Sequence, residues 1–475
     1  MQILKHFING RYVAGEQNAL FDLVSPVNGE VYAQSPDGGA AEVDQAYAAA
    51  KAAFAVWKHS LPSERQRALL KLADEIERNV ERLVDVQSQE TGQLKHFIER
   101  DEIAASCDAI RFFAGAARCL EGKASGEYTA GFTSTLRREP LGIVGQVTPW
   151  NYPFMMAVWK IAPALAAGNT VVLKPSDTTP ISTLMLAEIA APIFPQGAFN
   201  VVLGKAGTGS LVVSNPEASL VSITGSVRAG LQVAASAAAN LTKAHLELGG
   251  KAPVVVFADA DMSKAVEVIT AAGFSNSGQD CTAATRIIVE ESAYDAFLEK
   301  LIEKTKTITF GQPDDRDALY GALNSSNQLK QVTGFIERLP AHAKIETGGK
   351  KGAGPGFYFE PTIISGLKQH DEAIQHEVFG PVMTIQSFSG EEEALSQAND
   401  VEYGLAASVW TSSHSRAQRF STRLDFGTVW INNHIPLCAE MPHGGFKKSG
   451  YGKDLSSYSL DEYTRIKHIM CDITE

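Results

Sequence analysis

The sequence predicts an α/β fold in which largely parallel sheets are covered by helices. Short apolar runs alternate with helical stretches from about 141 to 240, and a second alternating block runs from about 250 to 435. Between about 40 and 120 the apolar residues recur three or four apart, which is the spacing of helices that bury one face. The chain has 475 residues, too many for one hydrophobic core, so we expect two or three domains.

The first 120 residues predict a hairpin followed by helices. FINGRYV (7–13) places Asn9-Gly10 between short apolar stretches, which is typical of a tight two-residue turn. The helical stretches read AAEVDQAYAAAKAAFAVWK and SERQRALLKLADEIERNVERLVDVQSQETG. Gly92 ends the second stretch and suits a helix C-terminus, where the backbone is often left-handed.

Residues 141–240 predict βαβ units. The apolar runs LGIVGQV, NTVVLKP, FNVVLG and SLVSITG are expected as buried strands, with helices in FMMAVWKIAPALAAG, TPISTLMLAEIAAPIF and KAGTGSLVVSN. The Ala-rich segment 235–240 is expected to end a further helix. A parallel sheet of this kind binds ligands at the carboxyl ends of its strands.

The second block predicts strands in APVVVFADA, TRIIVEE, GLAASVWT and GTVWIN. Outside both blocks, FTSTLRRE (132–139) and the tail SSYSLDEYTRIKHIM (456–470) are each expected as one more strand. Both are polar enough to be edge strands. Arms of this type often pair with a neighbouring subunit, so we expect a homo-oligomer, either a dimer or a tetramer.

Composition excludes several classes of protein. The net charge of −12 argues against a nucleic-acid or membrane-surface partner. MQILKHFINGRYVAGE lacks the apolar core of a signal peptide, and no uninterrupted apolar run is long enough to cross a bilayer. The five cysteines form no CxxC and match no zinc spacing. We therefore expect a reduced, cytoplasmic protein without a structural metal.

Two strand ends suit a nucleotide. The turn after SLVSIT contains Gly225 and Ser226 and runs into a predicted helix, whose free N–H groups attract phosphate. Its spacing is GSxxxG and not the GxGxxG fingerprint, so an ordinary tight turn is an alternative. At the end of an earlier strand, Lys174 precedes Ser176 and Asp177. Lys174 could hold ribose hydroxyls, and Asp177 would favour NAD over NADP, although both could be solvated strand-end charges.

Four further motifs contain side chains that could carry chemistry. In LELGGK, burial of Glu247 would raise its pKa toward that of a general base, although such acids are usually helix-surface charges. In TPWNYP, Asn151 could cap the next helix or donate its amide N–H to an oxyanion. In HEVFGP, Glu377 and Phe379 would face the same side of a strand. In SGQDCTAATR, Cys281 is either a packing residue or a nucleophile.

Taken together and in order, these motifs closely resemble the NAD(P)-dependent aldehyde dehydrogenase superfamily. They read PWN at 149, KPS at 174, TGS at 224, ELGG at 247, GQDC at 278, EVFGP at 377 and GGFKKSGYGKD at 444. The resemblance covers essentially the whole chain, without a long insertion. Many relatives have Arg and Glu at the charged positions of KKSGYGKD, and the replacements here keep the charge.

The resemblance implies a role for each residue of the site. Cys281 is the nucleophile and Glu247 the general base, while Asn151 supplies the side-chain half of an oxyanion hole that the Cys281 backbone N–H completes. The implied cofactor is NAD, with Lys174 on the adenosine ribose, Glu377 on the nicotinamide ribose and Phe379 against the nicotinamide ring. The remaining residues implied at the cofactor are Trp150, Ser176, Asp177, Gly225, Ser226 and Gly249.

The resemblance also implies three structural parts. They are a Rossmann-like cofactor domain (1–125 and 141–246), an α/β catalytic domain (247–440) and a β oligomerisation arm (126–140 and 455–475). The implied reaction is attack of the Cys281 thiolate on an aldehyde, hydride transfer to the nicotinamide, and hydrolysis of the resulting thioester to a carboxylic acid.

Asp280 raises the question of the substrate, because a carboxylate beside a nucleophilic cysteine disfavours the thiolate. It either points away from the pocket or pairs with a cationic substrate. GQDCTAA, GEYTAGFTSTLRREPLG and EMPHGGFKKSGYGKD most resemble the bacterial γ-aminobutyraldehyde dehydrogenases, which are relatives of the betaine-aldehyde and aminoaldehyde enzymes. The implied substrate is therefore 4-aminobutanal, and the implied pathway is putrescine breakdown.

Other side chains could help to bind such a substrate. The aromatic residues Tyr152, Trp159 and Phe446 suit a cation and an alkyl chain, although aromatics on a helix are more often core. Glu102 and Asp108 lie in an acidic segment that receives the amine in relatives, but their offset of six residues does not align them on one helix face.

Four alternatives remain open at this point. Betaine aldehyde or a general aliphatic aldehyde would use the same residues. An anionic substrate would need an arginine near the cysteine, and Arg286, the nearest in sequence, is expected to start a strand. Transfer of the thioester to coenzyme A is disfavoured by Glu247, which favours hydrolysis. An inactive binding or structural protein is disfavoured by the intact catalytic set.

Overall fold

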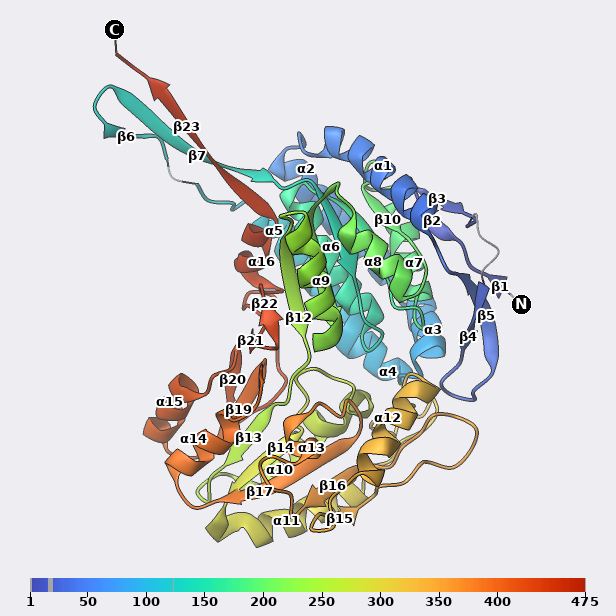
Figure 1. Ribbon diagram of the computed structural model, residues 1–475, viewed down its shortest axis with the longest axis vertical. Helices are drawn as coiled ribbons and strands as arrows, with labels where there is room; N and C mark the ends of the chain where they lie inside the picture. The colour runs from blue at the N-terminus through green and yellow to red at the C-terminus, as the bar shows by residue number, and fades with distance from the viewer. Residues whose placement is uncertain (1, 16–19, 123, 475) are drawn as a thin grey trace.

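The structure is a computed structural model that describes residues 2–15, 20–122 and 124–474. The first alternating block supplies the central strands of an eight-stranded sheet in one lobe, with the order β22-β12-β11-β8-β9-β10-β2-β3 (Figure 1). The strands β8 to β12 run parallel, and all the strands expected in 141–240 are present. Their bounds are β8 Ile143–Val147, β9 Thr170–Lys174, β10 Phe199–Val201, β11 Ala218–Gly225 and β12 Lys243–Leu248.

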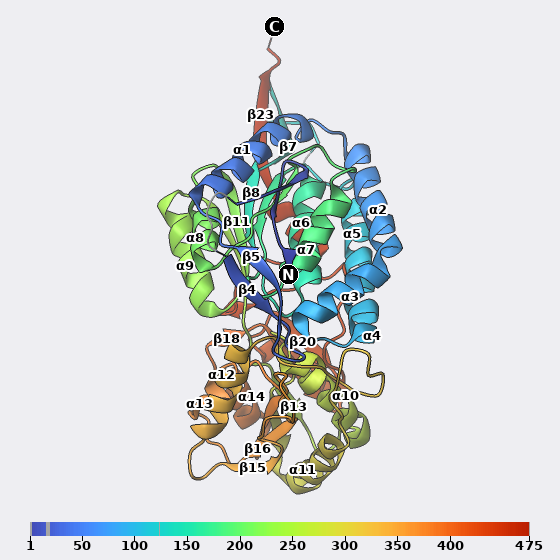
Figure 2. The same ribbon diagram turned by 90° about the vertical axis from the view of Figure 1, so that its right-hand side faces the viewer.

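Helices cover both faces of this sheet (Figure 2). One face packs against α1 (Ala40–Trp57), α8 (Ala206–Ser214) and α9 (Val227–Ala239), the helix that ends within 235–240 as expected. The other face carries α2 (Pro62–Arg78), α3 (Val80–Thr91), α5 (Ala104–Ala116), α6 (Pro153–Ala167) and α7 (Ile181–Ala190). A short helix α4 (Lys95–Phe97) and a π-helical turn (Ile98–Ile103) join α3 to α5.

The N-terminal predictions are confirmed. Strands β2 (His6–Ile8) and β3 (Arg11–Val13) pair antiparallel around Asn9 and Gly10, whose φ values of 55° and 73° fit the expected tight turn. Gly92 ends α3 with a φ of 75°. Strands β1 (Gln2–Ile3), β4 (Leu20–Val24) and β5 (Val31–Pro36) form a small separate sheet.

The second block forms a seven-stranded sheet in the other lobe, with the order β15-β16-β17-β14-β13-β19-β20. Only β15 runs antiparallel to its neighbour. The strands are β13 Pro253–Val256, β14 Arg286–Glu290, β15 Lys344–Thr347, β16 Thr362–Ser365, β17 Val382–Phe388, β19 Ala406–Trp410 and β20 Thr428–Ile431. The helices are α10 Met262–Phe274, α11 Glu291–Lys306, α12 Ser326–Glu337, α13 Glu372–Gln375, α14 Glu391–Asn399 and α15 His414–Arg423.

An arm projects from the first lobe (Figure 1). It is a three-stranded antiparallel sheet of β6 (Gly126–Thr129), β7 (Phe132–Pro140) and β23 (Thr464–Asp472), in the order β23-β7-β6. Two details of the prediction are wrong here. Residues 456–462 form helix α16 (Ser456–Glu462), because Ser456, Ser459 and Leu460 are buried at helical spacing. Strand β7 is central rather than an edge, because β6 covers its second side.

Three short strands connect the lobes. Strands β18 (Tyr403–Gly404) and β21 (Phe446–Lys447) pair with each other, and β22 (Gly450–Tyr451) joins β12 at the edge of the first sheet. The C-terminal segment therefore returns to the strand that carries Glu247. Within the described residues, no helix combines the length and the apolar character needed to span a membrane.

Candidate active site

A cavity of about 510 Å³ lies where the carboxyl ends of β8, β11 and β12 face the second lobe. Twelve of the residues expected in the site line it. They are Trp150, Asn151, Tyr152, Trp159, Gly225, Ser226, Glu247, Gly249, Asp280, Cys281, Glu377 and Phe379. The two alternating blocks of sequence thus meet at one cavity, as expected for parallel sheets that bind ligands at strand ends.

Cys281 follows a sharp turn of the backbone. Asn276, Ser277 and Gly278 have φ values of 51°, 58° and 67°, which turn the chain out of α10 toward the cavity. Ser277 Oγ donates to the Gly321 carbonyl at 2.9 Å and holds the turn against the second lobe. The thiol of Cys281 therefore lies on a loop that follows this hydrogen-bonded turn.

Asn151 belongs to a buried amide network. Its Nδ2 donates to the Gln279 carbonyl at 3.0 Å, close to Cys281. Its own carbonyl accepts from Gln93 Nε2 at 2.8 Å and from Asn276 Nδ2 at 2.9 Å. The alternative that Asn151 caps the next helix is wrong, because the N-cap residue of α6 is Tyr152. The network ties the loop after β8 to the loop that carries the cysteine.

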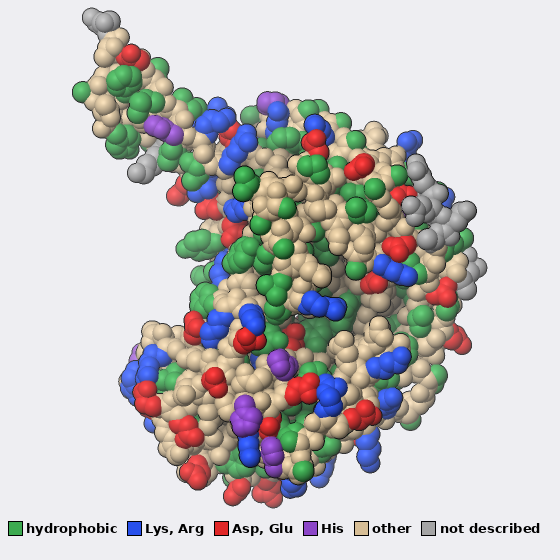
Figure 3. Space-filling model, in the orientation of Figure 1, with side chains coloured by type: hydrophobic (Ala, Val, Ile, Leu, Met, Phe, Trp, Pro, Cys, Tyr) green, Lys and Arg blue, Asp and Glu red, His purple; other side chains and the backbone are tan. Residues whose placement is uncertain are grey.

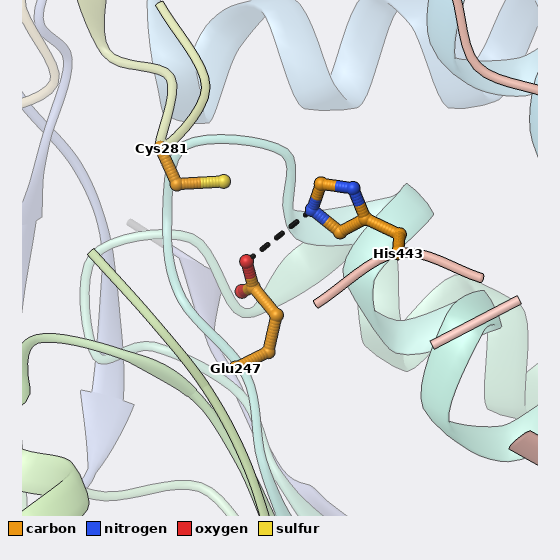
Figure 4. A group of neighbouring side chains, drawn as sticks. All are labelled: Glu247, Cys281 and His443. Carbon is orange, nitrogen blue, oxygen red and sulfur yellow. Dashed lines mark ion pairs between the residues drawn. The ribbon is translucent and has the colours of Figure 1, made fainter. Parts of the chain in front are cut away.

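Glu247, Cys281 and His443 point toward one another (Figure 4). Glu247 lies near the end of β12, is 2% exposed, and approaches His443 Nε2 at 3.4 Å. One side-chain atom from each residue lies within 4.8 Å of the others. Glu247 is thus a buried strand residue rather than the helix-surface charge that was an alternative.

The surroundings of Cys281 disfavour its thiolate form. Burial raises the pKa of the thiol well above the ordinary value, and the carboxylates of Glu247, Asp280 and Glu377 raise it further by repelling the thiolate. Formation of the thiolate is therefore favoured by a nearby proton acceptor or by a bound positive charge. The carboxylate of Glu247 points toward this thiol.

Glu377 is held by the glycines that follow Glu247. The backbone N–H of Gly250 donates to Glu377 Oε1 at 2.8 Å. A Cβ on Gly249 would lie 2.3 Å from Glu377 Oε2, so only glycine fits beside this carboxylate. Burial raises the pKa of Glu377 to about 8. The expectation of a strand is wrong, because Glu377 and Phe379 lie in a loop and Phe379 has a φ of 55°.

The turn between β11 and α9 has the expected form. Gly225 ends β11, and Ser226 caps α9 by accepting from the Ala229 N–H at 3.3 Å. Lys174 ends β9, which β8 separates from β11, and burial lowers its pKa. Lys174, Ser176 and Asp177 do not line the cavity itself.

Asp280 lines the cavity next to Cys281 and is anchored by three hydrogen bonds. Tyr152 Oη donates to Asp280 Oδ2 at 2.7 Å. The backbone N–H and the hydroxyl of Thr282 both donate to Oδ1 at 2.7 Å. Trp159 lies in the same cavity, with its ring edge-to-face with the His443 imidazole. A carboxylate and aromatic rings therefore share the substrate end of the cavity.

The family model described as "Aldehyde dehydrogenase family" matches residues 12–469. The chain belongs to the aldehyde dehydrogenase family. It is 39% identical to a betaine aldehyde dehydrogenase of Bacillus subtilis (strain 168), over 98% of this chain and 96% of that protein. It is also 39% identical to an aldehyde dehydrogenase of Emericella nidulans, over 98% of this chain and 95% of that one.

A solved relative has the same fold. A betaine aldehyde dehydrogenase from Staphylococcus aureus, solved in complex with NAD+, superposes with a TM-score of 0.96 at 35% identity. The match covers 99% of this chain and 95% of the other. The resemblance drawn from the motifs, and the α/β fold with it, are thereby confirmed.

Three residues expected at the substrate do not line the cavity of this aldehyde dehydrogenase. Glu102 is fully buried behind Tyr152, and burial raises its pKa to about 8. Asp108 is exposed on α5, because an offset of six residues places it on a different helix face. Phe446 is 44% exposed in β21, and the Lys453 ammonium lies 4.8 Å from its ring centre.

Sequence reasoning missed His443, the imidazole beside the catalytic pair. Its only local signal is its place in MPHGG, directly before the last recognised motif. It also missed Gln93 and Asn276, which hold the Asn151 carbonyl. Arg286, the candidate for an anionic substrate, is buried and donates to the carbonyls of Gln397 and Ala398 outside the cavity.

Proposed function

We propose that this aldehyde dehydrogenase oxidises 4-aminobutanal to 4-aminobutanoate with NAD, as a step of putrescine breakdown. The observation that carries the choice of substrate is the position of Asp280, which lines the cavity beside Cys281 together with Tyr152 and Trp159. A carboxylate attracts the ammonium group of the substrate, and aromatic faces suit both a cation and an alkyl chain.

The residues present fit NAD. The capped turn at Gly225 and Ser226 offers free N–H groups to the pyrophosphate, and Lys174 lies at the end of β9 in the same sheet for the adenosine ribose. Glu377, beside the glycines at 249 and 250, would receive the nicotinamide ribose. Phe379, edge-to-face with Trp150, would pack on the nicotinamide. When bound, NAD supplies the acceptor for the hydride that leaves the aldehyde carbon.

The residues of the chain carry the other steps. Glu247 removes the thiol proton, and the Cys281 sulfur bonds to the aldehyde carbon to form a thiohemiacetal. The Asn151 amide retains a second N–H for the oxyanion, and the backbone N–H of Cys281 is the other donor. After oxidation to the thioester, Glu247 releases the first proton to solvent and takes a second one from the water that attacks the thioester. The sulfur leaves the carbonyl carbon and regains a proton. The products are the free carboxylic acid and a regenerated thiol.

Betaine aldehyde is the second candidate substrate. Two relatives described above carry that name. Its trimethylammonium group would meet the same carboxylate and aromatic rings, but without hydrogen bonds to them. A broad aliphatic aldehyde dehydrogenase would use the same catalytic residues without needing Asp280.

Initial rates of NADH formation with 4-aminobutanal, betaine aldehyde and butanal test the proposal. We expect a kcat/KM for 4-aminobutanal at least about tenfold above that for butanal, which is about 1.4 kcal/mol of transition-state discrimination. Equal values for the charged and the neutral aldehyde would contradict the substrate assignment. A higher value for betaine aldehyde would select the second candidate.

We further propose that the arm joins subunits into a homo-oligomer, a dimer or a tetramer. Strand β23 has a free edge, and its exposed apolar side chains include Ile466, Ile469 and Met470. Hydrophobic side chains gather on this projecting arm in Figure 3. An unpaired, apolar edge is typically covered by another chain.

A further inference from the structure

The side chains of Glu247, Cys281 and His443 supply three ligand types that zinc prefers. They are a carboxylate oxygen, a thiol sulfur and an imidazole nitrogen, brought together from β12, the loop after α10 and the segment before β21. Such a set, with one position left for water, is typical of open zinc sites. The three residues lie far apart in the sequence, so no CxxC or HxxxH spacing predicts the site.

The distances fit a zinc ion after small side-chain rotations. The three candidate ligand atoms lie within 4.8 Å of one another, and the nitrogen–oxygen pair is already at 3.4 Å. At zinc–ligand lengths of about 2.0 to 2.3 Å, tetrahedral ligand atoms lie about 3.4 to 3.6 Å apart. The Cys281 sulfur is the atom that has to move closer to the other two ligand atoms. Cys281 is half-buried, has a short side chain and lines the cavity.

The surroundings favour a divalent cation. Glu247 is buried, yet neither of its carboxylate oxygens accepts a hydrogen bond of ordinary geometry from a described residue. Asp280 and Glu377 add two carboxylates to the same cavity, while Arg228 is the one lysine or arginine among the described residues that line it. Buried carboxylates without donors are costly, and a metal ion offsets that cost directly.

We propose that Cys281, Glu247 and His443 bind one Zn²⁺ and that the bound ion inhibits the enzyme reversibly. Binding exchanges the thiol proton for a sulfur–zinc bond and releases that proton to solvent. The coordinated sulfur can no longer attack an aldehyde, and the coordinated Glu247 can no longer accept a proton. Zinc and aldehyde therefore compete for the same sulfur, whichever aldehyde is the substrate.

Cobalt(II) is the probe for the site because it replaces zinc and reports its ligands in the absorption spectrum. Titration of Co²⁺ into the reduced, metal-free, full-length enzyme should saturate at one equivalent per chain. We expect a thiolate-to-cobalt charge-transfer band in the near ultraviolet and visible bands of tetrahedral intensity. Addition of Zn²⁺ should abolish both. A wild-type spectrum without the charge-transfer band would overturn the proposal.

Variants of the ligands and matched controls locate the site. His443→Phe should weaken Zn²⁺ binding by at least about 100-fold, since loss of even an outer-shell partner costs 10- to 100-fold. His443→Gln is the second variant if the first does not fold.

Two control variants leave the proposed ligands in place. They are His376→Phe, at an exposed histidine that lines the same cavity, and Cys438→Ser, at an exposed cysteine. Both controls should keep the cobalt spectrum. Unchanged binding in both His443 variants would refute the site.

Inhibition provides an independent readout. Micromolar Zn²⁺ should lower the rate of NADH formation competitively with aldehyde, and a chelator should restore it. Zn²⁺ should also protect Cys281 from alkylation in the absence of any substrate, with the labelled peptide identified by mass spectrometry. Protection that persists in His443→Phe would show binding to the cysteine alone and would overturn the three-ligand assignment. Because alkylation and the cobalt spectrum need no aldehyde, failure of the substrate proposal does not affect them.

Discussion

At the scale of single residues, Cys281 lies in an environment that opposes its own ionisation. Burial and three carboxylates raise the pKa of its thiol, so thiolate formation depends on a neighbouring base. We propose Glu247 as that base and as the base of the hydrolytic half of the reaction. A change at Glu247 should therefore affect both half-reactions, whereas a change at Asp280 should depend on the charge of the aldehyde.

Glu247→Gln should slow both half-reactions. The amide can take a proton neither from the Cys281 thiol nor from water, so thiohemiacetal formation and thioester hydrolysis both lose their base. We expect the first turnover and the steady state of NADH formation each to slow by about 10² or more. Rapid-mixing absorbance measures both phases. An unchanged rate in either phase would show that another group serves as the base in that half-reaction.

Asp280→Asn should affect charged aldehydes selectively. The amide keeps the size of the side chain but removes the negative charge that faces the substrate amine. We expect kcat/KM for 4-aminobutanal to fall about tenfold, equivalent to about 1.4 kcal/mol, with a much smaller change for butanal. Butanal is the internal control, because it reports any disturbance of the Tyr152 and Thr282 contacts. Equal losses of kcat/KM for both aldehydes would mean that Asp280 only stabilises the loop that carries Cys281 and does not bind the substrate amine.

At the scale of elements, a buried ion cluster joins α6 to β12 and to the C-terminal segment. Lys160 Nζ lies 2.8 Å from Asp454 Oδ2, and His245 Nε2 lies 3.3 Å from Asp454 Oδ1. His443 and Asp454 also exchange backbone hydrogen bonds at 2.7 and 2.8 Å. Since His443 contacts Glu247, the cluster positions the segment that completes the active site.

Lys160→Met should destabilise the protein strongly. It leaves the Asp454 carboxylate buried without its ammonium partner, which typically costs about 3 to 5 kcal/mol. The control is Lys51→Met, which breaks an exposed pair with Glu217 and should cost less than about 1 kcal/mol. Urea unfolding midpoints compare the two variants. Similar small shifts in both would contradict the structural role of the cluster.

The cost of Lys160→Met should shrink in acid. Asp454 is desolvated by burial, but Lys160 and His245 more than offset this and lower its pKa in the folded protein. A lowered carboxyl pKa contributes stability above the unfolded value of about 3.9, and the contribution is lost as the pH falls toward the folded value. The wild type and the variant should therefore converge below about pH 4. Midpoints that stay equally far apart at acid pH would contradict this.

At the scale of the whole molecule, the two lobes supply complementary halves of one cavity. The first lobe brings strand ends, a capped helix and the base, and the second brings the cysteine loop and Glu377. The arm extends away from both lobes (Figures 1 and 2). We propose that it contacts other copies of the chain.

Ile466→Asp should weaken subunit association. Ile466 is 63% exposed on β23, and a charge buried there on assembly would be unpaired. The control is Val56→Asp, at a site 66% exposed on α1. Sedimentation velocity at several concentrations should show a lower mass for the first variant alone. An unchanged mass for Ile466→Asp would mean that the arm does not form the interface.

Local sequence was sufficient for the fold class and for most of the candidate site residues that line the cavity. Glu247, Cys281 and Asn151 each lie in a short segment next to a strand end or a turn. A segment of this kind can be recognised from a few consecutive residues. The parallel sheet then brings these segments together, because the carboxyl ends of parallel strands share one edge. The same reasoning was wrong for Asp108 and Phe446. The local sequence does not show which helix face Asp108 occupies, and it does not show how exposed Phe446 is.

Only the tertiary structure shows His443 in the site. It reaches Glu247 because β22 pairs with β12, with Gly450 opposite Glu247, and because the backbone of His443 is bonded to Asp454. The strand pairing joins residues about 200 positions apart, and no local periodicity predicts it. The sequence by its motifs therefore indicates the aldehyde dehydrogenase family and predicts a nucleophilic cysteine and its base, while long-range strand pairing decides which third side chain lies beside them.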